Sequence, residues 1–177
     1  MKYLFFYKRY GLLRFLSNHE TMRMIERILR RTGMNLKMTE GFHQRLKLSF
    51  GQALPTGIID RAGLFLISTD EEIGQEFIGK INSLSPHGFE VYRICKVSEK
   101  FELGRSVNGY VFSLIFLEEP NIPEGWKIEK YGKIWKTSFF VAFNSSSPRT
   151  NAYGQYLTLR ESVVFKETFN DESACCG

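Results

Sequence analysis

A helix signal near the N-terminus constrains the fold of this chain more than any other feature. Ser17 and Glu20 have the spacing of a capping box, in which each side chain accepts a hydrogen bond from the backbone amide of the other residue. Apolar side chains then recur on one helical face. They are Met22, Ile25, Ile28 and Leu29. Because Gly33 supplies a stop signal, the pattern predicts an amphipathic helix between residues 17 and 33.

Short apolar segments on both sides of this helix have the pattern of strands. They are 3–7, the alternating segment 34–38, 63–68 and 90–97, with a shorter piece at 46–50 inside a long connection. A second capping box, Thr69 to Glu72, predicts a second helix that ends near Pro86. The order β-α-β-β-α-β indicates an α+β fold with a ferredoxin-like split β-α-β sheet and two helices on one face.

After the polar segment 100–106 the pattern changes to strands alone. The strand-like segments are 110–117, 126–130, 133–143 and 156–166. Tyr131-Gly132 lies between two of them and predicts a hairpin. We therefore expect a ferredoxin-like α+β domain over residues 1–104 and a smaller β-rich C-terminal subdomain over 105–177, with a frayed tail.

Positive charge is concentrated in the first part of the chain. The protein has a net charge of +5, but residues 1–50 hold 11 Lys+Arg against three Asp+Glu, which is +8, so the other 127 residues hold −3. This asymmetry favours a polyanion or an acidic protein surface as a partner. A solvated cationic face is the alternative.

Two groups of residues are candidates for nucleic-acid binding. The first is the polar face of the predicted helix, with Arg23, Arg27, Arg30 and Arg31, whose guanidinium groups match phosphate oxygens. The second is the loop 41–47, which carries Phe42, His43, Arg45 and Lys47. Stacking side chains together with cations suit an unpaired strand. The alternatives are a solvated helix face and a loop that covers the sheet.

Signals for catalysis and for bound groups are weak. His19, His43 and His87 have no companion nucleophile at an informative spacing. The acidic run at 70–72 is explained by the helix dipole. Cys95 lies in an apolar segment and is expected to be buried, and the sequence does not assign a role to Cys175 or Cys176. We expect no catalytic residue, cofactor or metal site.

One ordered set of residues in the first part of the chain carries a family resemblance. The set is Phe15-Leu16-Ser17, Met22-Arg23, Glu26-Arg27, Leu29-Arg30-Arg31, Gly33, Glu40-Gly41-Phe42, Lys47-Leu48-Ser49-Phe50, Ala53-Leu54-Pro55 and Gly57. These residues resemble the radical-SAM-linked family of bacteria, a domain of unknown function fused to, or encoded beside, a radical S-adenosylmethionine protein. The resemblance covers about residues 1–100 and implies such a protein as the partner.

The chain departs from the pattern of that family at two places. Family members often carry His where this chain has Asn18, and an Asn-Pro-His-Pro-like run where it has His43-Gln44-Arg45-Leu46. If those histidines perform chemistry in other members, this chain lacks it. The sequence also has no Cys-x3-Cys-x2-Cys, so the polypeptide is not itself the radical enzyme.

These patterns lead to one expected function and two alternatives. We expect a cytoplasmic, non-catalytic RNA-binding accessory module that acts beside a radical-SAM enzyme in RNA modification or ribosome-related metabolism. It would bind structured or single-stranded RNA and no membrane, because no apolar run approaches the about 20 residues of a membrane span. The alternatives are a protein adaptor without nucleic-acid contact and a metal-independent ribonuclease with His19 or His43 as the base.

Overall fold

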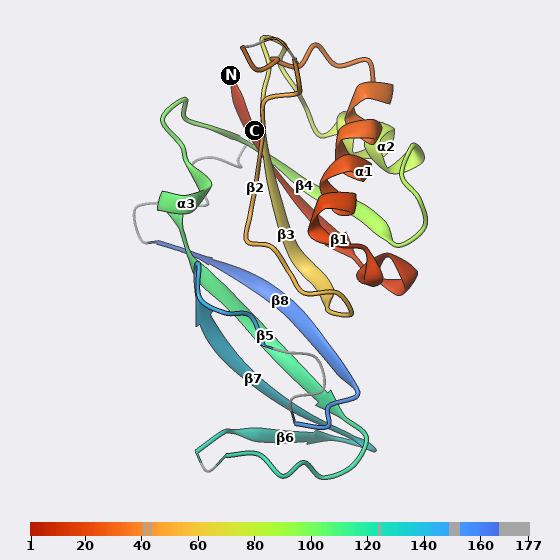
Figure 1. The fold of residues 1–177 in the computed structure, drawn as a ribbon, viewed down its shortest axis with the longest axis vertical. Coiled ribbons are helices and arrows are strands. Elements are labelled where there is room, and N and C mark those ends of the chain that lie inside the picture. The colour runs from red at the N-terminus through yellow and green to blue at the C-terminus, as the bar shows by residue number, and fades with distance from the viewer. Residues whose placement is uncertain (41, 43, 124, 149–152, 167–177) are drawn as a thin grey trace.

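The computed structural model describes residues 1–40, 42, 44–123, 125–148 and 153–166. Within them, eight strands form one mostly antiparallel sheet, in the order β4-β1-β3-β8-β5-β7-β6 with β2 added beside β3 (Figure 1). The elements are β1 (Lys2–Arg9), the 3-10 helix η1 (Gly11–Phe15), α1 (Asn18–Arg31), β2 (Leu48–Phe50), β3 (Ile59–Ser68), α2 (Glu76–Ser83), β4 (Phe89–Val97), α3 (Leu103–Ser106), β5 (Val107–Phe116), β6 (Ile128–Tyr131), β7 (Ile134–Ala142) and β8 (Leu157–Phe165).

The first core lies between the helices and one face of the sheet. β1 pairs antiparallel with both β3 and β4, and α1 and α2 lie side by side over this part of the sheet (Figure 1). Alternate residues of β1, namely Tyr3, Phe5 and Tyr7, point to the helices. They pack with buried side chains of α1 such as Ile25 and Leu29. The prediction of a mixed α+β fold is therefore confirmed.

The second core lies on the opposite face of the same strands. Leu4 and Phe6 of β1 pack there together with Leu64, and the strand-only part of the chain contributes Tyr110 and Phe112 of β5. The two parts are also joined edge to edge, because β3 and β8 pair in parallel. The second core thus contains residues from both sides of residue 104.

The predicted strand at 34–38 takes a different form. Its burial alternates as expected, with Leu36 buried and its neighbours exposed, but it forms only isolated bridges, Leu36 with Thr69 and Met38 with Leu46. The strand that pairs with β3 at this edge is β2, which lies within the shorter piece expected at 46–50. Residues 34–38 therefore border the sheet, and the extended pairing comes from the next segment along the chain.

The prediction of a second capping box, from Thr69 to Glu72, is wrong. The Thr69 hydroxyl donates to the Asn35 carbonyl at 2.7 Å and accepts from the Glu71 amide at 3.1 Å, and the Glu72 carboxylate pairs with Lys96 at 2.8 Å. Both side chains are thus used by tertiary partners. The helix starts later, at Glu76, and no side chain caps it.

Two amide side chains, one in α2 and one just before it, form hydrogen bonds with the edge strand β4. The Asn82 side chain accepts from the Val91 amide at 2.8 Å and donates to the Val91 carbonyl at 2.9 Å. Gln75 donates to the Ile94 carbonyl at 2.9 Å. These bonds take the place of a neighbouring strand and fix α2 on the sheet. No helix within the described ranges is long and apolar enough to span a membrane.

Candidate nucleic-acid interface

The capping box at the start of α1 forms as predicted and sets the orientation of the helix. The Ser17 hydroxyl accepts from the Glu20 amide at 3.2 Å, and the Glu20 carboxylate accepts from the Ser17 amide at 2.8 Å. Ile25, Ile28 and Leu29 are buried against the sheet. Their burial leaves the arginine face of α1 exposed to solvent.

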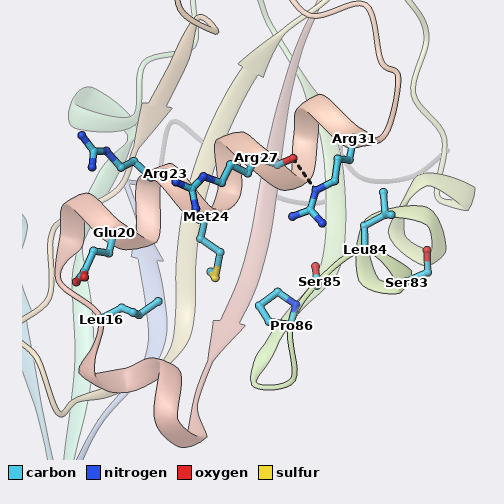
Figure 2. A pocket seen from close by; sticks show the side chains of 10 residues that line it. All are labelled: Leu16, Glu20, Arg23, Met24, Arg27, Arg31, Ser83, Leu84, Ser85 and Pro86. Atoms are coloured by element: carbon cyan, nitrogen blue, oxygen red, sulfur yellow. Dashed lines mark hydrogen bonds between the residues drawn. The ribbon is translucent and has the colours of Figure 1, made fainter.

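A groove of about 720 Å³ runs between α1 and the end of α2 (Figure 2). Residues of α1 and its N-terminal flank form one side, and residues 83–86 form the other. The lining residues are Leu16, Glu20, Arg23, Met24, Arg27, Arg31, Ser83, Leu84, Ser85 and Pro86. Three of the four arginines expected from the sequence therefore lie together beside one cavity.

These three arginines form a row along α1, which we call the arginine row: Arg23, Arg27 and Arg31. Figure 2 shows Arg31 turned toward the segment that holds Ser85, while Arg23 stands at the other end of the row. The Arg31 Nε donates to the Arg27 carbonyl at 3.3 Å, which holds the side chain in this direction. Three cations in a row beside one cavity can contact several anionic groups at once.

The fourth arginine lies outside the groove. Arg30 pairs with Glu26 at 2.8 Å, four residues earlier on α1, and it is not one of the lining residues. Its charge is therefore partly offset by a neighbour on the same helix. The sequence could not separate Arg30 from the other three, because all four fall on the polar face.

The charge of the groove is positive, with one acidic residue at its end. Glu20 is the only acidic residue among those lining the groove, against the three cations of the arginine row. The hydrogen bonds from Ser17 lower the pKa of the Glu20 carboxyl. Glu20 is therefore ionised at neutral pH and marks the N-terminal end of α1 with a negative charge.

None of the described residues of the loop expected at 41–47 lines this groove. Phe42 is 99% exposed, and Arg45 and Lys47 are also exposed. The backbone of the loop closes on itself, since the Thr39 amide donates to the Arg45 carbonyl at 2.7 Å. His43 lies outside the described residues. The loop and the arginine row are thus two separate cationic features.

The remaining histidines do not meet at a common site. His19 is exposed in the first turn of α1, and His87 packs edge-on against Tyr10, with ring centroids 6.1 Å apart. In the part of the chain that the structure describes, no three His, Cys, Asp or Glu side chains gather as a metal site requires. Cys95 is buried, whereas Cys175 and Cys176 lie outside the described residues.

The sequence missed the second side of the groove and one buried polar cluster. Residues 83–86 carry only a helix-end signal, Pro86, and nothing in the sequence relates them to α1. The cluster joins Asp60 of β3 to Arg160 of β8, 100 positions later. The only sequence feature that indicated this cluster is an aspartate, Asp60, at the start of an apolar strand.

Fold and site together define a class of protein: a mixed α+β sheet protein that carries a cationic groove between its two longer helices. The chain belongs to the family described as uncharacterized protein conserved in bacteria (DUF2344), whose model matches residues 2–139. The matched region contains α1, α2 and every residue of the groove. No curated protein matches the sequence.

Proposed function

We propose that this protein is a non-catalytic RNA-binding accessory module, and that it holds the RNA backbone in the groove between α1 and α2. The observation that carries the proposal is the arginine row, three exposed guanidinium groups beside one cavity of about 720 Å³. Guanidinium groups bind phosphate oxygens in a bidentate manner, and each phosphate that they neutralise releases counterions.

We further propose that residues 1–97 have the ferredoxin-like arrangement. The strand order β4-β1-β3-β2, antiparallel throughout, supports this assignment. So does the position of the helices, because α1 connects β1 to the β2 region and α2 connects β3 to β4. The assignment describes the scaffold of the groove and does not itself specify a ligand.

The proposed partner is a radical-SAM protein. This part of the proposal depends on the family resemblance of the residues between Phe15 and Gly57. In it, the partner performs the chemistry and the present chain supplies affinity for the RNA substrate. The cytoplasm is the proposed location, since both the RNA and a radical enzyme would be found there.

A protein adaptor is the second candidate, and a few exposed apolar side chains at and near η1 favour it. Leu12 and Phe15 of η1 are 86% and 56% exposed, and Tyr156 is 62% exposed. Phe15 and Tyr156 line the same cavity of about 320 Å³. Large exposed apolar side chains that lie together are typical of protein contact sites. A complex with the partner that survives nuclease treatment, with no RNA bound to the purified chain, would favour this function.

The first prediction tests the groove directly. The triple variant Arg23→Gln, Arg27→Gln, Arg31→Gln removes the arginine row while the buried face of α1 is unchanged. We expect the slope of log affinity against log salt to fall by about 2 in magnitude for single-stranded RNA, at about 0.7 per phosphate contact. Fluorescence anisotropy with a labelled RNA over about 50 to 300 mM salt measures this slope.

A matched control removes cations elsewhere on the surface. The variant Lys37→Gln, Lys96→Gln, Arg105→Gln loses three exposed positive charges that form surface ion pairs away from the groove. If both triple variants weaken RNA binding equally, the groove is not the binding site. Circular dichroism of each variant confirms that the fold is retained. RNA cleavage in EDTA that depends on His19 would instead identify the ribonuclease.

A further inference from the structure

We infer that the groove takes a run of about three consecutive phosphates of an unpaired RNA strand. This inference rests on the proposed function and narrows it to one class of RNA. It comes from the spacing of the arginine row, from the directions of its side chains and from the chemistry of the facing wall. Each of these is a property of the described residues around the groove.

The spacing of the arginine row matches successive phosphates of one strand. Arg23, Arg27 and Arg31 are four residues apart, so they repeat about every 6 Å along the axis of α1. Neighbouring phosphates of a nucleic-acid strand are separated through space by a distance of this order, in a paired and in an unpaired strand. The spacing therefore allows one arginine per phosphate, and the preference for an unpaired strand comes from the apolar residues of the groove, which bases stacked inside a duplex cannot contact.

The directions of the side chains exclude a cradle for one phosphate. Arg23 and Arg31 stand about 12 Å apart along the helix axis, and Figure 2 shows Arg31 turned toward the segment that holds Ser85, whereas Arg23 points away from that segment. A single phosphate that contacts one of them cannot reach the other. The Arg31 Nε bond to the Arg27 carbonyl keeps Arg31 turned toward the far wall. The three cations are thus arranged for successive anions.

Glu20 limits the run at one end. Its carboxylate lines the groove one helical turn before Arg23 and is fixed by the two hydrogen bonds of the capping box. A phosphate placed beside it would meet a like charge. The strand is therefore expected to leave the groove before Glu20, which restricts the contacts to the arginine row.

The wall of the groove opposite the arginine row, residues 83–86, can contact bases but offers little means to distinguish one base from another. Leu84 and Pro86 of this wall, together with Met24 of α1, present apolar surface to the groove, and no aromatic residue is among the lining residues. The hydroxyls of Ser83 and Ser85 already donate to the Lys80 and Ile81 carbonyls, each at 2.8 Å. With these donors occupied, hydrogen-bond readout of base edges is weak, so a low sequence preference is expected.

A length series tests the inference on the full chain. Labelled oligouridylates of about 2, 4, 6 and 10 nucleotides are compared with a blunt RNA hairpin, covering the shorter site sizes of single-strand binding proteins. We expect affinity to rise to about 4 nucleotides and then change little, a salt slope near 2 in magnitude, and at least tenfold weaker binding of the hairpin. Oligoadenylates are expected to bind within a few-fold of oligouridylates.

Two single variants of α1 assign the contacts to the row. Arg27→Gln should lower the salt slope by about 0.7, whereas Arg30→Gln, which removes the same charge from the same helix outside the groove, should lower it by less. A hairpin that binds as tightly as the unpaired strand, or affinity that keeps rising with length, would overturn the inference and leave RNA binding standing. The absence of binding to either RNA would instead overturn the proposed function.

Discussion

The buried pair of Asp60 and Arg160 is the residue-scale feature with the largest expected effect on stability. Arg160 is 2% exposed; its Nε donates to Asp60 at 2.8 Å, its Nη1 donates to the Gln52 carbonyl at 2.8 Å, and its Nη2 also donates to Asp60. The guanidinium lies 4.5 Å from the centre of the Tyr110 ring. One side chain thus connects β8, β3, β5 and the segment that contains Gln52.

Removal of one member of this pair should be strongly destabilising. Arg160→Met leaves the Asp60 carboxylate buried without its partner, and the expected loss is about 3–5 kcal/mol in the free energy of unfolding. Urea denaturation followed by circular dichroism measures the loss. The matched control is Asp60→Leu with Arg160→Met, in which no charge remains buried, and it should recover most of the stability. A loss below about 1 kcal/mol for Arg160→Met would contradict this prediction.

At the scale of elements, the capping box determines where α1 begins. The Ser17 hydroxyl satisfies one of the amides that a helix start leaves unpaired. The cap also fixes where the helix begins, and so which residues of α1 face the groove. A weakened cap should therefore affect both the stability of the protein and the position of Arg23, in the second turn.

Ser17→Ala should lower the free energy of unfolding by about 1 kcal/mol, since alanine cannot accept the Glu20 amide hydrogen bond. Ser17→Asp should retain most of the stability, because aspartate is also a good N-cap. Thermal and urea denaturation compare the three proteins. An Ala variant equal to the Asp variant would show that the cap contributes nothing.

The pH dependence of the cap has a definite sign. Because the hydrogen bonds from Ser17 lower the pKa of Glu20 in the folded protein, its contribution is present above the unfolded value of about 4.3. That contribution is lost as the pH falls through the lower, folded value. Glu20→Gln should therefore become less distinct from the parent protein in denaturation at acid pH.

At the scale of the whole molecule, the two cores depend on one sheet. The first core lies beneath α1 and α2, whereas the second joins β1 and β3 to β5 on the other face. Residues such as Leu4 and Phe6 would lose their cover if the second part separated from the first. We therefore expect the two parts to unfold together, although the sequence suggested a boundary near residue 104.

Two optical signals report on the two parts independently. Both tryptophans, Trp126 and Trp135, lie after residue 104, whereas the two longer helices lie before it. Tryptophan fluorescence thus follows the second part, and circular dichroism at helix wavelengths follows the first. We expect their urea transitions to coincide, which is the test of a single cooperative unit. Separate midpoints would instead show two domains.

The strongest local signals were sufficient to predict their elements. The capping box and the apolar face of α1, the short apolar run of β1, and the hairpin that leads from β6 to β7 all depend on neighbours within a few positions. Such interactions form in the same way wherever the segment lies in the fold. The exposed face of Arg23, Arg27, Arg30 and Arg31 followed from the same helical period.

Long-range contacts decided the rest. Thr69 resembled a helix cap, but its hydroxyl donates to the Asn35 carbonyl, a partner 34 positions away. Arg31 lines a groove only because α2 is fixed on the edge of β4, and this position of α2 places Ser85 opposite Arg31. Arg160 is buried because β8 returns beside β3 and brings it to Asp60. The sequence by itself determined elements such as α1, β1 and the hairpin from β6 to β7, since their signals are local. The tertiary structure alone determined which polar side chains meet, because their free energies depend on partners that only the complete sheet brings together.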